Sequence, residues 1–392
     1  MRFARAAALL PGVRFLGVFQ EMPRGEDATL YDDAIRVDDA LDASMLVDAV
    51  GMLAKRHGRP DRILGILEPL QVQLAEVRAR FGVPGTPVAT AHAFRDKAEM
   101  KDLLRAAGLP CARHKLLRSI ADAESFVAHV GFPIVLKPPA GMACKATWRI
   151  RTVDDLRQAL GAVHLSPDNP TLAEEFLVGR EFSFETITIG GRPLFQSFSR
   201  YYPTPLEVME TPWIQWCCVL PRDISGPDFD DARATGIRAI QALGLETGFT
   251  HMEWFRREDG SVAIGEIAAR PPGANIVRMN SFAHDADMYR AWARAVVDDA
   301  FEGPWARRYS VGCAFLRGPG RGRVVRTVGA ARANELIEQI GASVVEVKLP
   351  SAGAPKSDSY EGDGSVIVRH PDTEIVKKAM TILIESIQVQ YA

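Results

Sequence analysis

The sequence predicts an α/β protein with three domains, and three observations support this fold class. Over the first ninety residues, apolar patterns typical of strands alternate with patterns typical of helices, as in a parallel sheet covered by helices. From residue 171 the apolar pattern changes to a period of two, which is typical of antiparallel hairpins. The pattern changes again after Pro304. Because 392 residues exceed what one hydrophobic core holds, we expect an N-terminal α/β domain, a central domain and a C-terminal lobe at residues 1–92, 93–305 and 306–392.

Charge and composition argue against two classes of partner. The chain has 47 Lys and Arg residues against 49 Asp and Glu residues, so no basic surface for nucleic acid is expected. No apolar stretch approaches the roughly 20 residues of a membrane span. The five cysteines are scattered, without the spacing of a zinc site or a disulfide framework. We therefore expect a cytoplasmic protein that binds neither nucleic acid nor membrane.

The N-terminal domain combines predicted strands at residues 14–19 and 63–67 with predicted helices at residues 42–57 and 70–81. Ligands of parallel sheets bind beyond the carboxyl ends of the strands. Glu68 comes directly after the second strand, which makes it a candidate substrate residue. A solvated loop carboxylate is the more frequent alternative at such a position.

A second α/β unit is predicted after residue 95. Asp96 is a typical cap for a helix over residues 96–107, because its side chain accepts hydrogen bonds from the first free amides. Strands are expected at residues 132–137 and 147–150, and Thr152 is expected to cap the next helix.

No glycine-rich loop of the usual nucleotide-binding types occurs in the chain. The segment at residues 137–145 nevertheless follows a predicted strand and contains Lys137 and Lys145. Backbone amides and lysines in such a loop bind phosphate groups. With a single glycine, the segment is a modest signal by itself.

A first hairpin is predicted around the glycine pair at residues 190–191. A two-residue turn would place Glu181 opposite Arg200, which is an ordinary cross-strand ion pair. The irregular segment at residues 201–227 is rich in proline and aromatic residues and is a candidate substrate loop.

The most informative hairpin turns at residues 259–260, an Asp-Gly pair between two apolar strands. A two-residue turn places Glu253 opposite Glu266, with their Cβ atoms about 4.5–5.5 Å apart. Like charges at this distance are destabilising unless a cation lies between them, and oxygen ligands favour a hard divalent cation such as Mg²⁺. The alternative is that both carboxylates face water beside lysine or arginine side chains.

The C-terminal lobe is predicted to begin with a hairpin formed by residues 311–316 and 323–327. The glycines at residues 318–322 join these two strands, so we interpret them as a turn rather than a phosphate site. A strand at residues 365–369 and a helix at residues 372–388 are expected to close the chain.

Five segments follow one another along the chain: FRDKAEMKDLLRAAGLP, FPIVLKPPAG, EEFLVGREFS, HMEWF and GEIAARPPG. In this order and spacing they resemble the ATP-grasp superfamily, in the branch that contains biotin carboxylase and the L-amino-acid ligases. The resemblance extends from about residue 12 to the C-terminus and is strongest at residues 94–275. It implies an ATP-grasp fold with an N-terminal parallel α/β domain, a central two-lobed ATP-binding domain and a C-terminal lobe like that of biotin carboxylase.

The resemblance implies how ATP would be bound. Lys97 and Lys137 would contact its phosphates, and the loop that contains Lys145 would cover them. Glu181 would hold the ribose hydroxyls, which replaces the ion-pair interpretation of this residue. The residues of the adenine-binding hinge would be Glu174, Glu175, Phe176 and Leu177.

The resemblance also implies a metal site and a catalytic arginine. Glu253 and Glu266 would bind Mg²⁺, or Mn²⁺, between the phosphates, in agreement with the expected hairpin register. Arg270 would bind the reacting carboxylate or acyl phosphate. Arg270 and Lys137 are therefore the candidate catalytic residues.

The sequence departs from the family pattern at three places. Ala268 stands where many members have asparagine, as in some dipeptide-forming ligases, so a second metal site would lack one ligand. His251, opposite Ala268 in the expected hairpin, is the candidate to replace that ligand. Cys144 occupies a loop position that is usually Gly or Ser. The first strand of the family pattern, before the first helix, has no counterpart, so we expect either a short N-terminal sheet or a misassigned start codon.

The chemistry that the resemblance implies is carboxylate activation, in which ATP phosphorylates a carboxylate and an amine attacks the acyl phosphate. We therefore expect an ATP-dependent carboxylate–amine ligase that forms a peptide or amide bond from amino acids or similar small acids, and that is a homodimer. An alternative is a bicarbonate-activating carboxylase of the biotin or purine type. The third alternative is a non-catalytic nucleotide-binding module.

Further substrate residues are candidates on position alone. Arg278, eight residues after Arg270, could bind a second carboxylate or could be a solvated surface arginine. Aromatic residues that could line a substrate pocket or belong to the core are Tyr201, Tyr202, Trp213 and Trp216.

Overall fold

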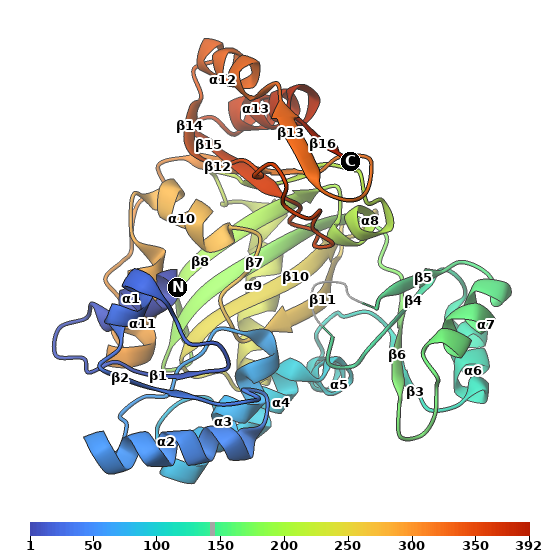
Figure 1. Ribbon diagram of the computed structural model, residues 1–392. Helices are drawn as coiled ribbons and strands as arrows, with labels where there is room; N and C mark the ends of the chain where they lie inside the picture. The colour runs from blue at the N-terminus through green and yellow to red at the C-terminus, as the bar shows by residue number, and fades with distance from the viewer. Residues whose placement is uncertain (142–145) are drawn as a thin grey trace.

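The structure, a computed structural model, describes residues 1–141 and 146–392. A large eight-stranded sheet forms its centre, and a small four-stranded sheet with two helices stands to one side (Figure 1). In this view most of the N-terminal segment lies below the large sheet, and the C-terminal part of the chain lies above it. Within the described ranges, no helix has the length and apolarity needed to cross a membrane.

The N-terminal segment surrounds a short parallel sheet, in which β1 (Leu16–Phe19) pairs with β2 (Asp33–Arg36). Asp42 caps the long helix that follows, since its side chain accepts hydrogen bonds from the amides of Ser44 and Met45. The helices of this segment are α1 (Arg2–Ala8), α2 (Ala43–His57), α3 (Gln71–Phe81), α4 (Val88–Arg95) and α5 (Lys97–Ala106), with 3-10 helices η1 (Gly25–Leu30) and η2 (Glu68–Leu70).

The strand predicted at residues 63–67 is not formed. In the part of the chain that the structure describes, this segment pairs with no strand. Leu64 and Ile66 pack instead against the apolar cluster of α11 (Met288–Asp298). A short apolar run can pack into the core either as a strand or as an extended segment outside a sheet. The apolar pattern therefore does not distinguish a strand from an extended segment.

The small sheet has the order β3-β6-β4-β5, and neighbouring strands are antiparallel. Capping boxes begin both of its helices: Ser119 with Asp122 in the first, and Thr152 with Asp155 in the second. The elements of this sheet are β3 (His114–Leu117), α6 (Ile120–Val130), β4 (Ile134–Lys137), β5 (Trp148–Ile150), α7 (Val153–Ala162) and β6 (Thr171–Glu175).

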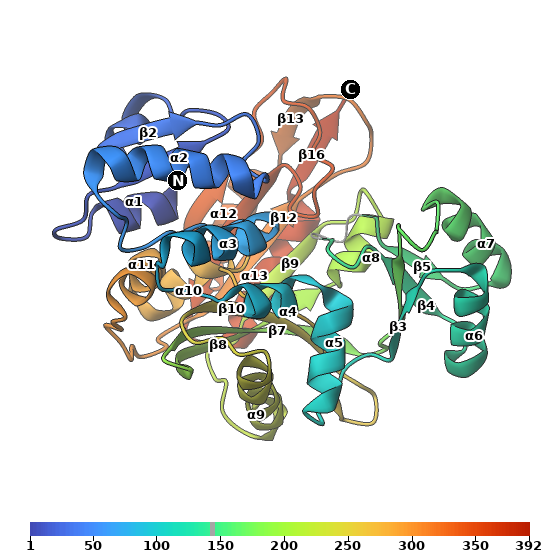
Figure 2. The same ribbon diagram turned by 90° about the horizontal axis from the view of Figure 1, so that it is seen from below.

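The large sheet has the order β11-β10-β7-β8-β9-β12-β15-β14. Figure 2 shows α9 on one face of this sheet and α10 and α11 on the other. Its strands are β7 (Arg180–Ile189), β8 (Arg192–Tyr202), β9 (Trp216–Leu220), β10 (Gly248–Arg256), β11 (Val262–Ala268), β12 (Ser310–Leu316), β14 (Ser343–Lys348) and β15 (Gly364–His370). The remaining elements are α8 (Pro205–Glu210), α9 (Pro227–Ala242), α10 (Ile276–His284), β13 (Val324–Val328), α12 (Ala330–Gln339), α13 (Thr373–Ser386) and β16 (Gln388–Tyr391).

The face beneath α9 contains the largest aromatic core. Phe184, Phe198 and Trp254 are fully buried there. Gly236 brings α9 close to this layer, because a Cβ at that position would lie 2.5 Å from the ring of Phe184. The packed layer holds β7 and β10 in place, and both strands lead to the site described below.

The C-terminal hairpin predicted for residues 311–316 and 323–327 is wrong. β12 pairs with β9 and β15, whereas β13 pairs with β16. Every residue of β12 is buried, and a strand buried on both faces suits the interior of a sheet rather than an isolated hairpin. The large sheet thus continues across residue 305, and residue 92 lies inside α4, so the division into three domains stays a prediction.

Candidate active site

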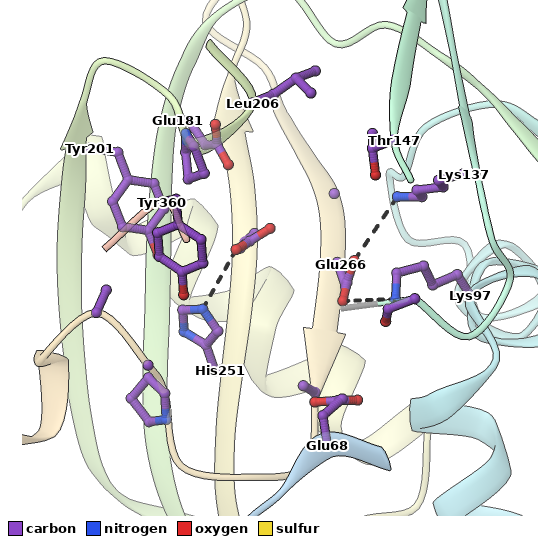
Figure 3. Close-up of a pocket in the computed structure, with 18 of the residues that line it drawn as sticks. Glu68, Lys97, Lys137, Thr147, Glu181, Tyr201, Leu206, His251, Glu266 and Tyr360 are labelled. Carbon is purple, nitrogen blue, oxygen red and sulfur yellow. Dashed lines mark hydrogen bonds and ion pairs between the residues drawn. The ribbon is translucent and has the colours of Figure 1, made fainter. Parts of the chain in front are cut away.

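A cavity of about 500 Å³ lies between the small and the large sheet (Figure 3). Its walls come from β4 and β6 on one side and from β7, β10 and β11 on the other. The residues predicted from the sequence that line it are Glu68, Lys97, Lys137, Glu174, Glu175, Phe176, Leu177, Glu181, Tyr201, Trp216, His251, Glu253, Glu266 and Arg270.

The β10–β11 hairpin places Glu253 opposite Glu266, as predicted, but through a different register. Its turn closes with a hydrogen bond from the amide of Arg257 to the carbonyl of Ser261, at 2.9 Å, which shifts the pairing by one residue. A bulge at Gly265 shifts it back. A Cβ at Gly265 would lie 3.3 Å from the carbonyl oxygen of Glu253, so glycine suits this close approach. The two deviations cancel, and the carboxylates oppose each other.

Glu266 is held by two lysines from the opposite wall. The Nζ of Lys97 lies 3.0 Å from its Oε1, and the Nζ of Lys137 lies 4.0 Å from its Oε2 (Figure 3). Burial alone would raise the pKa of Glu266, but the two lysines lower it to about 2. Glu266 is therefore ionised at neutral pH, the state in which a carboxylate binds a cation.

Glu174 links two lysines deeper in the wall. Its Oε2 lies 2.9 Å from the Nζ of Lys137, and its Oε1 lies 3.2 Å from the Nζ of Lys101. Burial opposes ionisation of Glu174, but the lysines outweigh it and lower its pKa. Lys101 is fully buried and also donates to the carbonyl of Gly265 in the bulge. The sequence analysis missed Lys101, although it follows Lys97 by four residues and thus lies on the same helical face.

Glu253 faces His251 rather than a lysine. The Nε2 of His251 lies 3.7 Å from Oε1 of Glu253, and its Nδ1 lies 3.1 Å from Oε1 of the fully buried Glu185. Burial lowers the pKa of His251, but hydrogen bonds to both carboxylates outweigh it and raise it to about 9. His251 is therefore protonated at neutral pH and offers a positive charge instead of a free nitrogen for a metal.

Glu181 lies on β7 and does not face Arg200. The pairing of β7 with β8 shifts by one residue after Ile187, so Phe182 is the residue opposite Arg200. The predicted ion pair is wrong because this irregularity is invisible in the turn sequence. Burial and the nearby Glu253 carboxylate raise the pKa of Glu181 well above its usual range. Hydrogen-bond donors of a ligand would stabilise its charged form.

Arg270 and Glu68 form an ion pair across 202 positions of sequence, with the Nε of Arg270 2.6 Å from the Oε2 of Glu68. Glu68 is buried, although a solvated carboxylate was the more frequent alternative. Burial lowers the pKa of Arg270, but the Glu68 carboxylate outweighs it and raises it. A second hydrogen bond joins Nη1 of Arg270 to the carbonyl of Pro271 at 2.9 Å. The guanidinium is thus oriented before any substrate binds.

The connection between the two sheets contains Glu175, Phe176 and Leu177, all of which line the cavity. The carboxylate of Glu175 is engaged by Arg257 at 2.8 Å. The side chain of Glu175 therefore has a structural partner, and its amide donates to the carbonyl of Arg113 at 2.8 Å. Lys145, the remaining predicted ATP residue, lies outside the described residues.

Three predicted substrate residues do not line the cavity. Arg278 donates to Oε2 of Glu346 at 2.6 Å. Tyr202 packs against the core cluster of α13, because successive residues of a strand face opposite sides and its neighbour Tyr201 faces the cavity. Trp213 is 60% exposed after the end of α8. Residue type and sequence position alone do not distinguish these three residues from those that line the cavity.

Other lining residues had no signal in the sequence. Phe3 comes from α1, whereas Tyr360 comes from the loop before β15. The Tyr360 ring lies edge-on to Trp216, with centroids 5.5 Å apart. Further lining residues that the sequence analysis did not name include Thr147, Leu206 and Glu361.

The carboxylates fit a magnesium ion that is shared with a phosphate ligand. Among the described residues, no group of three or more His, Cys, Asp or Glu side chains could hold a metal by itself. Glu253 and Glu266 instead offer oxygen ligands from adjacent strands. Mg²⁺ usually takes one or two carboxylates and completes its shell with water and substrate phosphates.

Comparisons with known proteins found one family model and several similar proteins. Residues 102–282 match the ATP-grasp domain. The chain is 28% identical over 253 residues to an L-arginine-specific L-amino acid ligase of Bacillus subtilis, and the match covers 63% of this chain and 60% of that relative, less than two thirds of its length.

Two solved structures share the overall architecture. The L-amino acid ligase from Bacillus licheniformis has a TM-score of 0.79 at 17% identity, covering 97% of this chain and 99% of that chain. The N5-carboxyaminoimidazole ribonucleotide synthetase from Thermotoga maritima has a TM-score of 0.72 at 19% identity, covering 100% and 96%. At these identities the likeness concerns the fold.

Proposed function

We propose that the protein is an ATP-dependent carboxylate–amine ligase, because residues 102–282 match the ATP-grasp domain and the chain shares the fold of the L-amino acid ligase from Bacillus licheniformis. It would join amino acids or similar small acids through an acyl phosphate, forming a peptide or amide bond and releasing ADP and phosphate. The observation that carries this proposal is one cavity in which Lys97 and Lys137 contact Glu266, which lies opposite Glu253, and which Arg270 also lines.

ATP would lie between the two sheets. The backbone of residues 175–177 would pair with the adenine, and Lys97 and Lys137 would neutralise the phosphates. Glu181 would accept hydrogen bonds from the ribose hydroxyls. In support, Glu181 is buried in the cavity wall, and among the described residues it has no ion pair.

Glu253 and Glu266 would hold Mg²⁺ or Mn²⁺. When bound, the ion supplies charge neutralisation at the transferred phosphoryl group. His251, fixed by Glu185, would add a positive charge on the side where Ala268 offers no ligand.

Arg270 would bind the carboxylate of the acid substrate and then the oxyanion that forms when the amine attacks the acyl phosphate. The new C–N bond forms at the acyl carbon, and the C–O bond to the phosphate breaks with its electrons on phosphate. Glu68 would act through Arg270, because it fixes the orientation of the guanidinium.

The substrate end of the cavity would accept amino acids. Tyr201, Trp216 and Tyr360 form an aromatic wall of this cavity, which Arg270 and Glu68 also line. The Bacillus subtilis relative is named for L-arginine. For this chain we propose amino acids as the class of substrate. The screen with single and paired amino acids described below would identify which amino acids are used.

The test is phosphate release from Mg·ATP by the purified protein, screened with single and paired amino acids. The expected result is release that depends on particular amino acids, with a product whose mass is that of a condensation. A Glu266→Gln variant controls for contaminating ATPases. ATP binding without amino-acid-dependent release for any pair would contradict the ligase proposal.

A bicarbonate-activating carboxylase is the second candidate, supported by the fold shared with the Thermotoga maritima synthetase. Phosphate release driven by bicarbonate without amino acids would favour it. The cytoplasmic location and the homodimer stay predictions from the sequence.

A further inference from the structure

A second cavity, of about 240 Å³, lies behind Arg270. Arg270 and Pro271 line both cavities, so the loop after β11 separates them. The other walls come from the extended segment 62–65, from α3 and its following loop, from the start of β10 and from α11. None of these walls belongs to the proposed nucleotide site.

The distinctive residue of this cavity is Arg78, which lies on α3 and is only 8% exposed. Its Nε donates to the carbonyl of Ile63 at 2.8 Å. Across residues 1–141 and 146–392, no carboxylate forms an ion pair with Arg78. Burial lowers its pKa to about 10. A buried charge without a partner is unfavourable, and an anion in the cavity would remove that penalty.

The other charges around the cavity are already neutralised or solvated. Arg62 forms an ion pair with Asp299 at 2.9 Å. Arg270 is paired with Glu68, on the side of the main cavity. Glu246 lines the second cavity but is exposed to solvent and forms no ion pair with Arg78 among the described residues. Arg78 is thus the buried cation of the lining that lacks a counter-charge.

The absence of a side chain at Gly85 leaves room for the side chain of Arg78. A Cβ at Gly85 would lie 2.8 Å from the Cδ of Arg78. Thr86 and Thr247 also line the cavity and carry hydroxyl groups that donate hydrogen bonds to oxyanions. A guanidinium matches the oxygens of carboxylates and phosphates, which it binds through two parallel N–H groups.

We propose that the second cavity binds a small oxyanion, either inorganic phosphate or a free carboxylate, through Arg78. This site is distinct from the proposed ATP site and does not depend on the proposed function. The anion would lie behind Arg270, in a space that the main cavity does not share.

The experiment is calorimetric titration of the whole protein with sodium phosphate and, separately, with sodium acetate at constant ionic strength. Arg78→Gln is expected to weaken binding of the preferred anion about 10-fold to 100-fold, the usual effect of losing a hydrogen bond to a charged group. Arg80→Gln removes the same charge from an exposed position of α3 and is expected to bind like the wild type. Lys97→Gln removes a phosphate contact of the main cavity and is also expected to bind.

Unchanged binding in Arg78→Gln, or loss only in Lys97→Gln, would place the anion in the main cavity and overturn the proposal. Failure of the wild type to bind either anion would overturn it too. If circular dichroism shows that Arg78→Gln does not fold, wild-type crystals soaked in selenate decide the question. An anomalous peak beside Arg78 supports the site, and a map without one rejects it.

Discussion

Single residues set the charge balance of the main cavity. Glu266 is held by Lys97 and Lys137, whereas Glu253 faces the protonated His251. Each carboxylate of the opposed pair therefore has its own cation, which relieves the repulsion that two like charges across a hairpin would produce. In the proposed ATP complex, the lysines would turn to the phosphates and leave the carboxylates for the metal ion.

The first prediction concerns Glu266→Gln. The substitution keeps the shape of the side chain but removes its charge, so we expect kcat to fall by at least about 100-fold while the fold is retained. Steady-state kinetics and circular dichroism measure the two effects. Glu258→Gln, the same change in the exposed turn of this hairpin, should leave kcat unchanged. A variant that stays fully active and still requires magnesium would disprove the metal assignment.

The second prediction concerns Glu68→Gln, because Glu68 orients Arg270 through a 2.6 Å contact. We expect kcat/KM for the acid substrate to fall about 10-fold to 100-fold, as misplacement of a reacting group does. The KM for ATP should not change. Glu76→Gln, at an exposed position of α3, is the matched control. If kcat/KM fell equally for ATP and for the acid substrate, Glu68 would have a general structural role instead.

At the scale of elements, the small sheet depends on capped helices that are independent of the site. In α6, Asp122 accepts hydrogen bonds from the amides of Arg118 and Ser119 and lies 3.0 Å from the Nζ of Lys115. The hydrogen bond from Lys115 is the main cause that lowers the pKa of Asp122 from 3.8 to about 2. This cap was predictable in kind, since Ser and Asp three residues apart precede an apolar helix.

The third prediction is a pH dependence of the free energy of unfolding. A depressed carboxyl pKa stabilises the folded state above the unfolded pKa, and this contribution is lost as pH falls through the folded pKa. Asp122→Asn should therefore destabilise the protein above about pH 4, and its difference from the wild type should disappear as pH falls through about 2. Urea unfolding at a series of pH values measures it. Glu124→Gln, exposed on the same helix, should show no such dependence. A difference that stays constant with pH would contradict the assigned pKa.

At the scale of the whole molecule, the cavity depends on segments that are distant in sequence. Glu346 of β14 contacts both Arg2 of α1, at 3.2 Å, and Arg278 of α10, at 2.6 Å. The N-terminal segment is thus joined to the C-terminal lobe, and Phe3 reaches the cavity wall. A ligand between the two sheets would add contacts across the molecule.

The fourth prediction follows from this arrangement. Mg·ATP at 100 times its Kd should stabilise the wild type by about 2.7 kcal/mol, because it binds only the folded chain. Glu181→Ala should lose most of this stabilisation and should raise the KM for ATP more than it changes kcat. Thermal unfolding with and without Mg·ATP, and ATP titrations of the rate, measure the two effects. Glu258→Ala is the control, and a Glu181→Ala variant that ATP stabilises like the wild type would refute the ribose assignment.

Much of the site was predictable because its signals are local. The helix cap at Asp96 and the two strands around residues 259–260 follow from capping chemistry and turn residues. The pairing of Glu253 with Glu266 was correct only because a turn shift and the Gly265 bulge cancel. Bulges depend on the packing of neighbouring strands and are not visible in the turn sequence. The register shift after Ile187 is the reason why the predicted pairing of Glu181 with Arg200 was wrong.

The sequence by itself determined the alternation of strands and helices, the order of the motifs, and the lysines and carboxylates of the site. These features depend on residues that are close in the chain, where hydrogen-bond geometry and apolar periodicity act directly. Only the tertiary structure decided that Glu68 contacts Arg270, that Lys101 contacts Glu174, and that Arg78 is buried with no counter-charge among the described residues. Such contacts depend on how sheets and helices pack across long stretches of chain, and no local pattern records that packing.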